Sequence, residues 1–118
     1  MSKKLLVVLS VLMVVVFVLT ACAPAAPAEA KIKACEVTDT GGVDDKSFNA
    51  TGWAGLERAA EELGVEIKYL ESEQASDYEV NLNSFVEDGC DLIIPVGFLL
   101  ADATSAAADA NPDQKYAI

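Results

Sequence analysis

The side chains best suited to chemistry are concentrated in one short segment, residues 39–49, which reads Asp-Thr-Gly-Gly-Val-Asp-Asp-Lys-Ser-Phe-Asn. Its three aspartates offer acceptors for hydroxyl or amine donors, and Ser47 and Asn49 can both donate and accept. The two glycines allow backbone angles closed to other residues and a close approach to a ligand. Phe48 could stand exposed as a stacking surface. The segment is therefore the candidate binding loop of this chain.

Each of these residues also has a structural interpretation. Ser47 or Asp45 could cap the following helix. Asp44 could be a solvated or turn-forming carboxylate, and Phe48 could belong to the core. The Asp39-x-Gly-Gly pattern differs from a G-x-G-x-x-G fingerprint, and an acidic loop would repel phosphates. We therefore expect neither dinucleotide binding nor another cofactor.

Strand-like and helix-like patterns alternate around this loop. Strands are expected at residues 33–39, 65–70, 91–96 and from Lys115 onward, and helices at residues 47–63, 77–88 and 99–110. Gly64 and Gly89 end the first two helices. The first helix should carry Phe48, Gly52, Leu56, Ala59 and Leu63 on one face, and the apolar residues of the second are Val80, Phe85 and Val86.

This alternation predicts an α/β fold with a doubly wound parallel sheet. Ligands of such sheets bind outside the carboxyl ends of the strands, where the 39–49 loop and the Gly97–Phe98 turn both fall. Pro95 suggests a bulge or the last paired position of the third strand, because proline lacks a ladder donor. The chain ends just as a fourth strand begins, so residues 33–118 are expected to be the first part of a larger lobe.

The amino-terminal segment predicts export. Lys3 and Lys4 precede fifteen residues in which Ser10 is the only polar one. A helix of that length rises about 22 Å, short of the ~30 Å core of a bilayer, so a signal peptide fits better than a spanning helix. The sequence Leu-Thr-Ala-Cys at residues 19–22 resembles a bacterial lipobox, although an ordinary secretory signal is the alternative.

We accordingly expect residues 1–21 to be a lipoprotein signal peptide and Cys22 to carry the lipid. Residues 22–32 would be a Pro/Ala-rich tether, and the protein would face the extracytoplasmic side of the cell membrane. After removal of Lys3 and Lys4, six basic residues face nineteen acidic ones, a net charge of −13. This charge argues against nucleic acid as a partner.

Histidine is absent, which excludes Ser/His or Cys/His catalysis within these residues, and the cysteines have no zinc-like spacing. We expect no enzyme activity and no metal. Cys35 and Cys90 should lie at or just before the starts of adjacent strands if the strand order is 2-1-3. A disulfide between them is one option. Two buried free thiols are favoured, because adjacent parallel strands seldom offer disulfide geometry.

The sequence Val-Thr-Asp-Thr-Gly-Gly-Val-Asp-Asp-Lys-Ser-Phe-Asn at residues 37–49, followed by Trp53-x-Gly55 and by Val-Gly-Phe at residues 96–98, resembles the basic membrane protein family. These are lipid-anchored solute-binding proteins of ABC importers and include the purine nucleoside receptor lipoproteins. The resemblance implies a type I periplasmic-binding-protein-like lobe, of which this chain holds an incomplete part. It also implies a nucleoside ligand and an ABC permease as partner.

By the same resemblance, Phe48 would be one of two aromatic walls around the nucleobase, and Asp45 and Asn49 would hydrogen-bond base or ribose. Asp39 would line the pocket. The set is completed by Ser47, Gly97 and Phe98, whereas Trp53 is expected to pack.

Three alternatives remain open. One is a binder of a sugar or other small metabolite, favoured if Phe48 points into the core. Another is an enzyme or signalling domain in which Asp39, Asp44 and Asp45 hold Mg²⁺. The third is a surface protein for adhesion or signalling.

Overall fold

The computed structural model describes residues 3, 4, 6 and 31–118 of the chain. Residues 31–118 form one compact unit. Most of the expected signal peptide lies outside the described residues, as do Cys22 and the expected tether apart from residues 31–32. Among the residues described, none of the helices has the length and apolar character needed to cross a bilayer.

Four parallel strands form one sheet in the order β2-β1-β3-β4. The strands are β1 (Lys33–Thr38), β2 (Glu66–Leu70), β3 (Leu92–Val96) and β4 (Lys115–Tyr116). They alternate with α2 (Phe48–Leu63), α3 (Asp77–Glu87), the short 3₁₀ helix η1 (Phe98–Leu100) and α4 (Ala101–Ala110). The predicted α/β class, parallel sheet and inner strand order are confirmed. The predicted boundaries hold to within one residue, except that the helix expected at residues 99–110 begins with the separate 3₁₀ turn.

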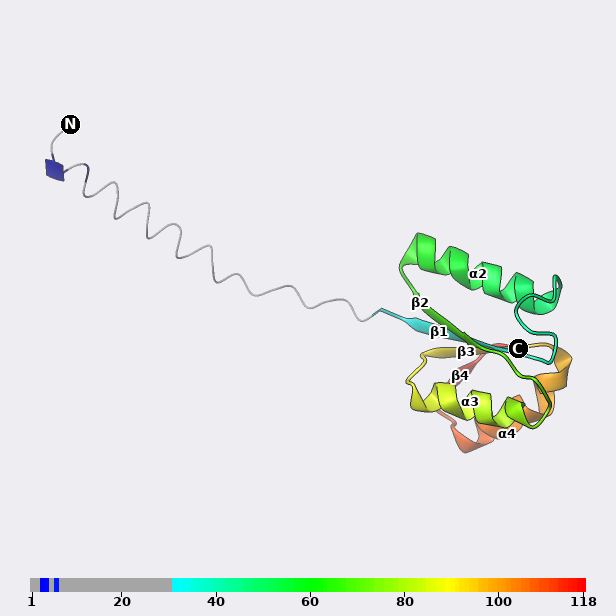
Figure 1. The fold of residues 1–118 in the computed structure, drawn as a ribbon. Helices are drawn as coiled ribbons and strands as arrows, with labels where there is room; N and C mark the ends of the chain where they lie inside the picture. The colour runs from blue at the N-terminus through cyan, green and yellow to red at the C-terminus, as the bar shows by residue number, and fades with distance from the viewer. Residues whose placement is uncertain (1–2, 5, 7–30) are drawn as a thin grey trace. The chain divides into compact units, whose positions relative to one another are not determined.

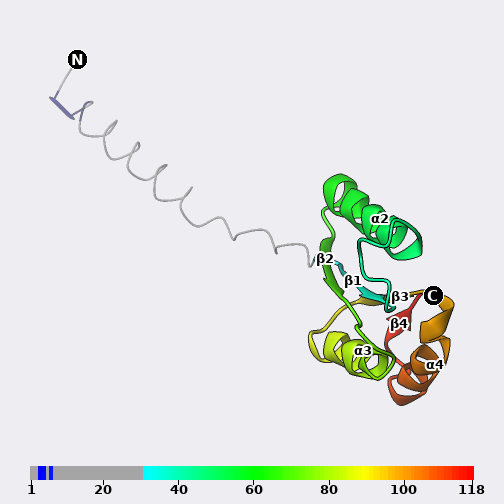
Figure 2. The same cartoon turned by 45° about the vertical axis from the view of Figure 1, so that its right-hand side comes forward.

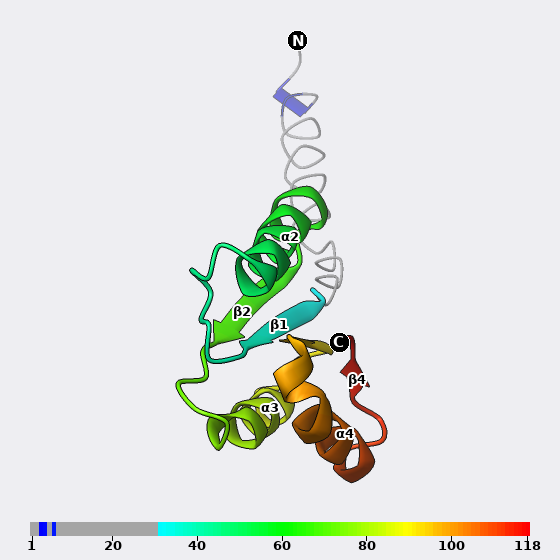
Figure 3. The same cartoon turned by 90° about the vertical axis from the view of Figure 1, so that its right-hand side faces the viewer.

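Helices cover both faces of this sheet. Helix α2 lies on one face, and α3 and α4 lie on the other (Figure 1). The turned view shows the same three layers with β1 and β3 between them (Figure 2). The β1–α2 loop reaches the same edge of the sheet as the end of β2 (Figure 3).

The hydrophobic core lies between the sheet and the α3–α4 layer. Alternate residues of β1 and β3 point into it, which follows from the two-residue period of a strand. Its buried members are Cys35, Val37, Tyr78, Leu82, Phe85, Cys90, Ile93, Leu100 and Ala107. Val80, which the sequence pattern placed on the apolar side of its helix, is instead 62% exposed. Tyr78 and Leu82 occupy the core in its place.

Cys35 and Cys90 form a disulfide, so the preference for two free thiols was wrong. The Cα atoms are 6.1 Å apart, inside the usual range for a bridge. The expectation failed because it applied the geometry of two paired strands, whereas Cys90 precedes β3 and lies in the turn after α3. Cys35 pairs in register with Ile93, and Cys90 lies in the preceding turn, where its N–H donates to Phe85 O. That turn lets the thiol approach from outside the strand.

The α2 side of the sheet is more polar than the pattern predicted. Leu56 is buried, but Phe48 and Leu63 are 75% and 77% exposed, so the predicted face is wrong at both ends of α2. Beneath the middle of the helix lies Glu36, which is fully buried although it is an acid. Gly52 provides the space for its carboxylate, since a Cβ there would lie 3.0 Å from Glu36 Oε2.

Pro95 neither bulges nor ends β3. It pairs in register with Val37, and Val96 continues the ladder opposite Thr38. The carbonyl of Ile93 accepts a hydrogen bond from Ala117, so Ile93 directs its backbone polar groups toward β4. Pro95, two residues further along, has the same orientation. Its missing donor therefore leaves the β1 ladder intact.

Candidate binding site

The candidate loop lies at the carboxyl edge of the sheet, as predicted. It leaves β1 after Thr38 and returns into α2 at Phe48. Two turns shape it: Gly42 N–H donates to Asp39 O at 3.2 Å, and Asp45 N–H donates to Gly42 O at 3.3 Å. Gly42 adopts φ +70° and Lys46 φ +55°. The loop is therefore folded back on itself, which brings its two ends together.

Asp39 and Asn49 meet where those ends converge. Asn49 Nδ2 donates to Asp39 Oδ1 at 2.8 Å, and Gly41 N–H donates to the same oxygen at 2.9 Å. Asn49 is almost fully buried, and its Oδ1 has no hydrogen-bond partner in the described part of the chain. The side-chain N–H of Asn49 thus binds and orients Asp39, whereas the side-chain oxygen of Asn49 has no partner in the described residues.

The second carboxylate oxygen of Asp39 lies against Gly97, at the end of β3. A Cβ atom at Gly97 would be only 2.8 Å from Asp39 Oδ2, and Gly97 has φ +105°. A side chain is thus disfavoured here both by the backbone angle and by the space. The structure therefore brings Gly97, which the sequence placed on a separate segment, next to Asp39 and Asn49 of the 39–49 loop.

Asp45, not Ser47, caps α2. Its carboxylate accepts from the N–H groups of Ser47 at 2.8 Å, Asn49 at 3.2 Å and Ala50 at 3.0 Å. The Ser47 side chain makes no capping bond. The hydrogen bond from Ala50, together with those from Ser47 and Asn49, lowers the pKa of Asp45 below its ordinary value, against the opposing effect of desolvation. Asp45 is therefore a charged, fixed acceptor at the base of the loop.

Two exposed aromatic rings also lie at the carboxyl edge of the sheet. Phe48 is 75% exposed and Phe98 is 84% exposed. With Gly97, Ala101 and Ile118 they line a hollow of about 450 Å³. Phe48 is not a core residue, so the structural interpretation of this side chain is wrong. The carboxyl edge combines an apolar wall with a short row of polar acceptors.

Trp53 packs, as expected. Its ring meets Tyr69 of β2 edge to face, with centroids 4.8 Å apart. Asp44 is exposed on the loop. Within residues 31–118 and the few described before them, no three His, Cys, Asp or Glu side chains converge as metal ligands would. The magnesium alternative lacks the convergence it required.

Sequence reasoning missed Glu71, which touches the loop from a different element. Val43 N–H donates to Glu71 Oε1 at 2.7 Å. Glu71 directly follows β2, the neighbour of β1 in the sheet. Its position one residue beyond an adjacent strand was the signal that could have identified it.

Solved structures with the same arrangement define the class. The chain is similar to an ABC transporter solute-binding protein from Aeropyrum pernix K1, with a TM-score of 0.66 and 36% identity over 72% of this chain and 23% of that one. The fold is thus one that ABC transporter solute-binding proteins share.

The chain belongs to the Bmp family, whose model, described as ABC transporter substrate-binding protein PnrA-like, matches residues 32–118. This confirms the resemblance drawn from the 37–49 motif. Among curated relatives, the ABC transporter nucleoside-binding protein BmpA of Lactococcus lactis subsp. cremoris is 37% identical over 100% of this chain and 36% of its own length. A lipoprotein of Pyrococcus abyssi is 39% identical over 75% of this chain and 22% of its own length. The chain therefore spans about a fifth to a third of the length of these relatives.

Proposed function

We propose that this chain is part of a lipid-anchored solute-binding component of an ABC importer, and that it captures a nucleoside, most favourably a purine nucleoside. The carboxyl edge of its sheet supplies one side of the binding site. The observation that carries the proposal is the exposed ring of Phe48 next to the hydrogen-bonded pair of Asp39 and Asn49. The family supports substrate binding, and the name of the Lactococcus lactis relative supports a nucleoside.

Stacking is the proposed role of the aromatic rings. A nucleobase is a flat ring that buries much apolar surface against an aromatic side chain at little conformational cost. Phe48 offers such a surface because it is fixed at the start of α2 and still exposed. Phe98 lines the same hollow from η1 and would contact the base or its sugar.

Polar recognition is assigned to the loop. Asp39 Oδ2 makes no hydrogen bond within the described residues, so it can accept from a ribose hydroxyl or a base amine. The buried Oδ1 of Asn49 is an acceptor that lacks a partner, and a buried acceptor left unpaired costs about 1–3 kcal/mol. Asp45, Ser47 and the Gly97 backbone complete the proposed contact set. A ligand with donors in the right places would relieve these unpaired acceptors.

Cys22 is proposed to carry the lipid that holds the protein at the extracytoplasmic side of the cell membrane. A relative named as a lipoprotein supports this assignment. The anchored protein would deliver its nucleoside to an ABC permease. We assign no catalytic residue, cofactor or metal, and no nucleic-acid partner.

Isothermal titration calorimetry tests the proposal by measuring the heat of binding for a panel of nucleosides and sugars. The protein is prepared from residue 23 onward, so that it lacks Cys22 and its lipid. We expect heat with purine nucleosides and none with sugars. Phe48→Ala should weaken binding roughly tenfold to hundredfold, because stacking on one base contributes about 1–3 kcal/mol. Leu63→Ala is the matched control, since Leu63 is equally exposed at the other end of the same helix. No heat with any nucleoside would refute the proposal.

The sugar alternative would have been favoured if Phe48 pointed into the core. The exposure of Phe48 removes that support. Heat with a sugar but not with a nucleoside would restore it.

A further inference from the structure

Residues 40–46 of the binding loop are hydrogen-bonded to the rest of the fold at few points. Their backbone bonds run within the loop or to its own ends. In residues 31–118, one hydrogen bond joins these residues to an element other than β1 and α2, and it runs from Val43 N–H to Glu71 Oε1. This bond bridges 28 residues of sequence. Within the described residues, Glu71 thus joins this part of the loop to the region just after β2.

Glu71 is itself well anchored. Asn81 Nδ2, from α3, donates to Glu71 O at 3.1 Å and to Ser72 Oγ at 3.0 Å. Ser72 is 3% exposed, so the backbone just after β2 is held against α3. The Glu71 carboxylate extends from this fixed base toward the loop. A continuous set of contacts therefore runs from α3 to the turn at Val43.

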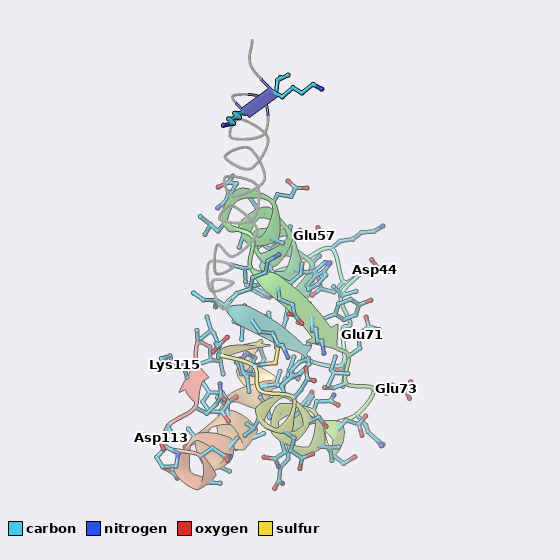
Figure 4. The ribbon with its side chains drawn as sticks, turned by 90° about the vertical axis from the view of Figure 1, so that its left-hand side faces the viewer. Asp44, Glu57, Glu71, Glu73, Asp113 and Lys115 are labelled. Carbon is cyan, nitrogen blue, oxygen red and sulfur yellow. A yellow bond between two sulfur atoms is a disulfide. The ribbon has the colours of Figure 1, made fainter. Side chains whose placement is uncertain are left out.

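The Glu71 carboxylate lies close to two consecutive residues of the loop, Gly42 and Val43. A Cβ at Gly42 would lie 3.0 Å from Glu71 Oε1, and Gly42 has φ +70°. The glycine leaves room for the carboxylate to reach the next N–H. Figure 4 shows Glu71 at the end of β2 on the side of the loop that bears Asp44, whereas Glu73 projects outward.

Charge does not explain this position. The loop already carries Asp39, Asp44 and Asp45, so another carboxylate adds repulsion. What offsets that repulsion is the short hydrogen bond from a backbone N–H to an ionised acceptor, which is stronger than a bond between neutral groups. The hydrogen bond from Val43 N–H is thus the favourable contact that accounts for this position.

We propose that Glu71 is a positioning residue for ligand binding. By fixing the turn at residues 42–43 it sets the geometry of the loop whose ends present Asp39, Phe48 and Asn49. Glu71 itself need not touch the ligand. This inference rests on the proposed function, because binding is the property that the positioning serves.

The test compares Glu71→Ala, Glu71→Gln and Glu73→Ala in the full-length, lipid-free protein. The first readout is amide hydrogen exchange at Val43. Exchange should accelerate in Glu71→Ala. It should be intermediate in Glu71→Gln, whose neutral amide oxygen accepts a weaker bond, and should stay near the wild-type rate in Glu73→Ala. Unchanged exchange at Val43 in Glu71→Ala would overturn the proposal.

The second readout is the dissociation constant for the purine nucleoside that binds best, with thermal unfolding as a check on folding. We expect about tenfold weaker binding for Glu71→Ala, on the scale of one charge-assisted hydrogen bond, with partial recovery in Glu71→Gln. Faster exchange with unchanged affinity in Glu71→Ala would also overturn the proposal. If the wild type binds no nucleoside, the proposed function fails, while exchange at Val43 still shows whether Glu71 fixes the loop.

Discussion

The carboxylate of Glu36 lies directly beneath Gly52, so close that a Cβ atom on Gly52 would be 3.0 Å from Oε2. Neither carboxylate oxygen has a hydrogen-bond partner among the described residues, and the side chain is fully buried. Burial raises the pKa of Glu36 from 4.5 to about 7, and the charge of Asp45 adds to the effect. An acid therefore lies under the helix that presents the binding loop.

Stability should depend on pH through Glu36. Between pH 4.5 and about 7 the unfolded chain loses the proton that the folded chain keeps, so the free energy of unfolding falls as pH rises. The contribution is fully present below pH 4.5 and is lost through pH 7, a change of about 3 kcal/mol. Denaturant unfolding of wild type and Glu36→Gln across this range measures it. Parallel pH profiles for the two proteins would contradict the prediction.

Gly52→Ala should destabilise the protein although alanine favours helices. Its methyl group would meet Glu36 Oε2 at 3.0 Å and Val96 Cγ2 at 3.1 Å, and such overpacking costs typically 1–3 kcal/mol. Gly55→Ala is the control, because nothing lies within 4 Å of a Cβ there. That variant should gain up to about 1 kcal/mol. Thermal unfolding of both variants decides the matter, and a stabilised Gly52→Ala would show that the contact is relieved by movement.

The layers of the fold and the place of the candidate loop could be predicted from the sequence for a common reason. Strand and helix periods are local, and residues 39–49 are contiguous, so neither required knowledge of tertiary contacts. Glu71 was not identified from the sequence, because its contact with the loop depends on β2 lying beside β1. The burial of Glu36 escaped because it depends on a glycine one layer away. The disulfide was judged from two ideal strands, whereas Cys90 lies in a turn whose path the sequence does not specify.

Reduction of the Cys35–Cys90 disulfide should strongly destabilise the fold. The bridge closes a separation of 55 residues, for which loop entropy gives about 4 kcal/mol. Denaturant unfolding with and without a thiol reductant measures the loss in a protein that lacks Cys22. The double variant Cys35→Ala/Cys90→Ala should not respond to reductant. An identical midpoint for oxidised and reduced wild type would contradict the prediction.

Gly97→Ala should weaken ligand binding as well as stability. Its φ of +105° disfavours alanine, and the added Cβ would lie 2.8 Å from Asp39 Oδ2 and displace that carboxylate. Gly89→Ala separates the two effects, because Gly89 also has positive φ but has open space around it. Gly89→Ala should lower the free energy of unfolding by about 1–2 kcal/mol, and Gly97→Ala should lower it more, because its Cβ also meets the Asp39 carboxylate. Calorimetry should find weaker nucleoside binding in Gly97→Ala alone.

Asp45→Ala should destabilise α2, whereas Ser47→Ala should not. Asp45 accepts three backbone N–H groups at the start of the helix, and the Ser47 hydroxyl accepts none of them. Since the pKa of Asp45 is lowered, its contribution is present above the ordinary pKa of an aspartate and is lost as pH falls through the lowered value. Melting temperatures of both variants at pH 7 provide the test. Equal losses would mean that the serine shares the capping.

The disulfide also bears on when this domain can fold. Both cysteines belong to the core, and the bond between them forms in oxidising compartments and rarely in the cytoplasm. Under the proposed export, a newly made chain would start without the crosslink, at a lower stability than after the disulfide forms. If that export uses the unfolded chain, the difference would favour the translocation-competent state before export and the folded state after it.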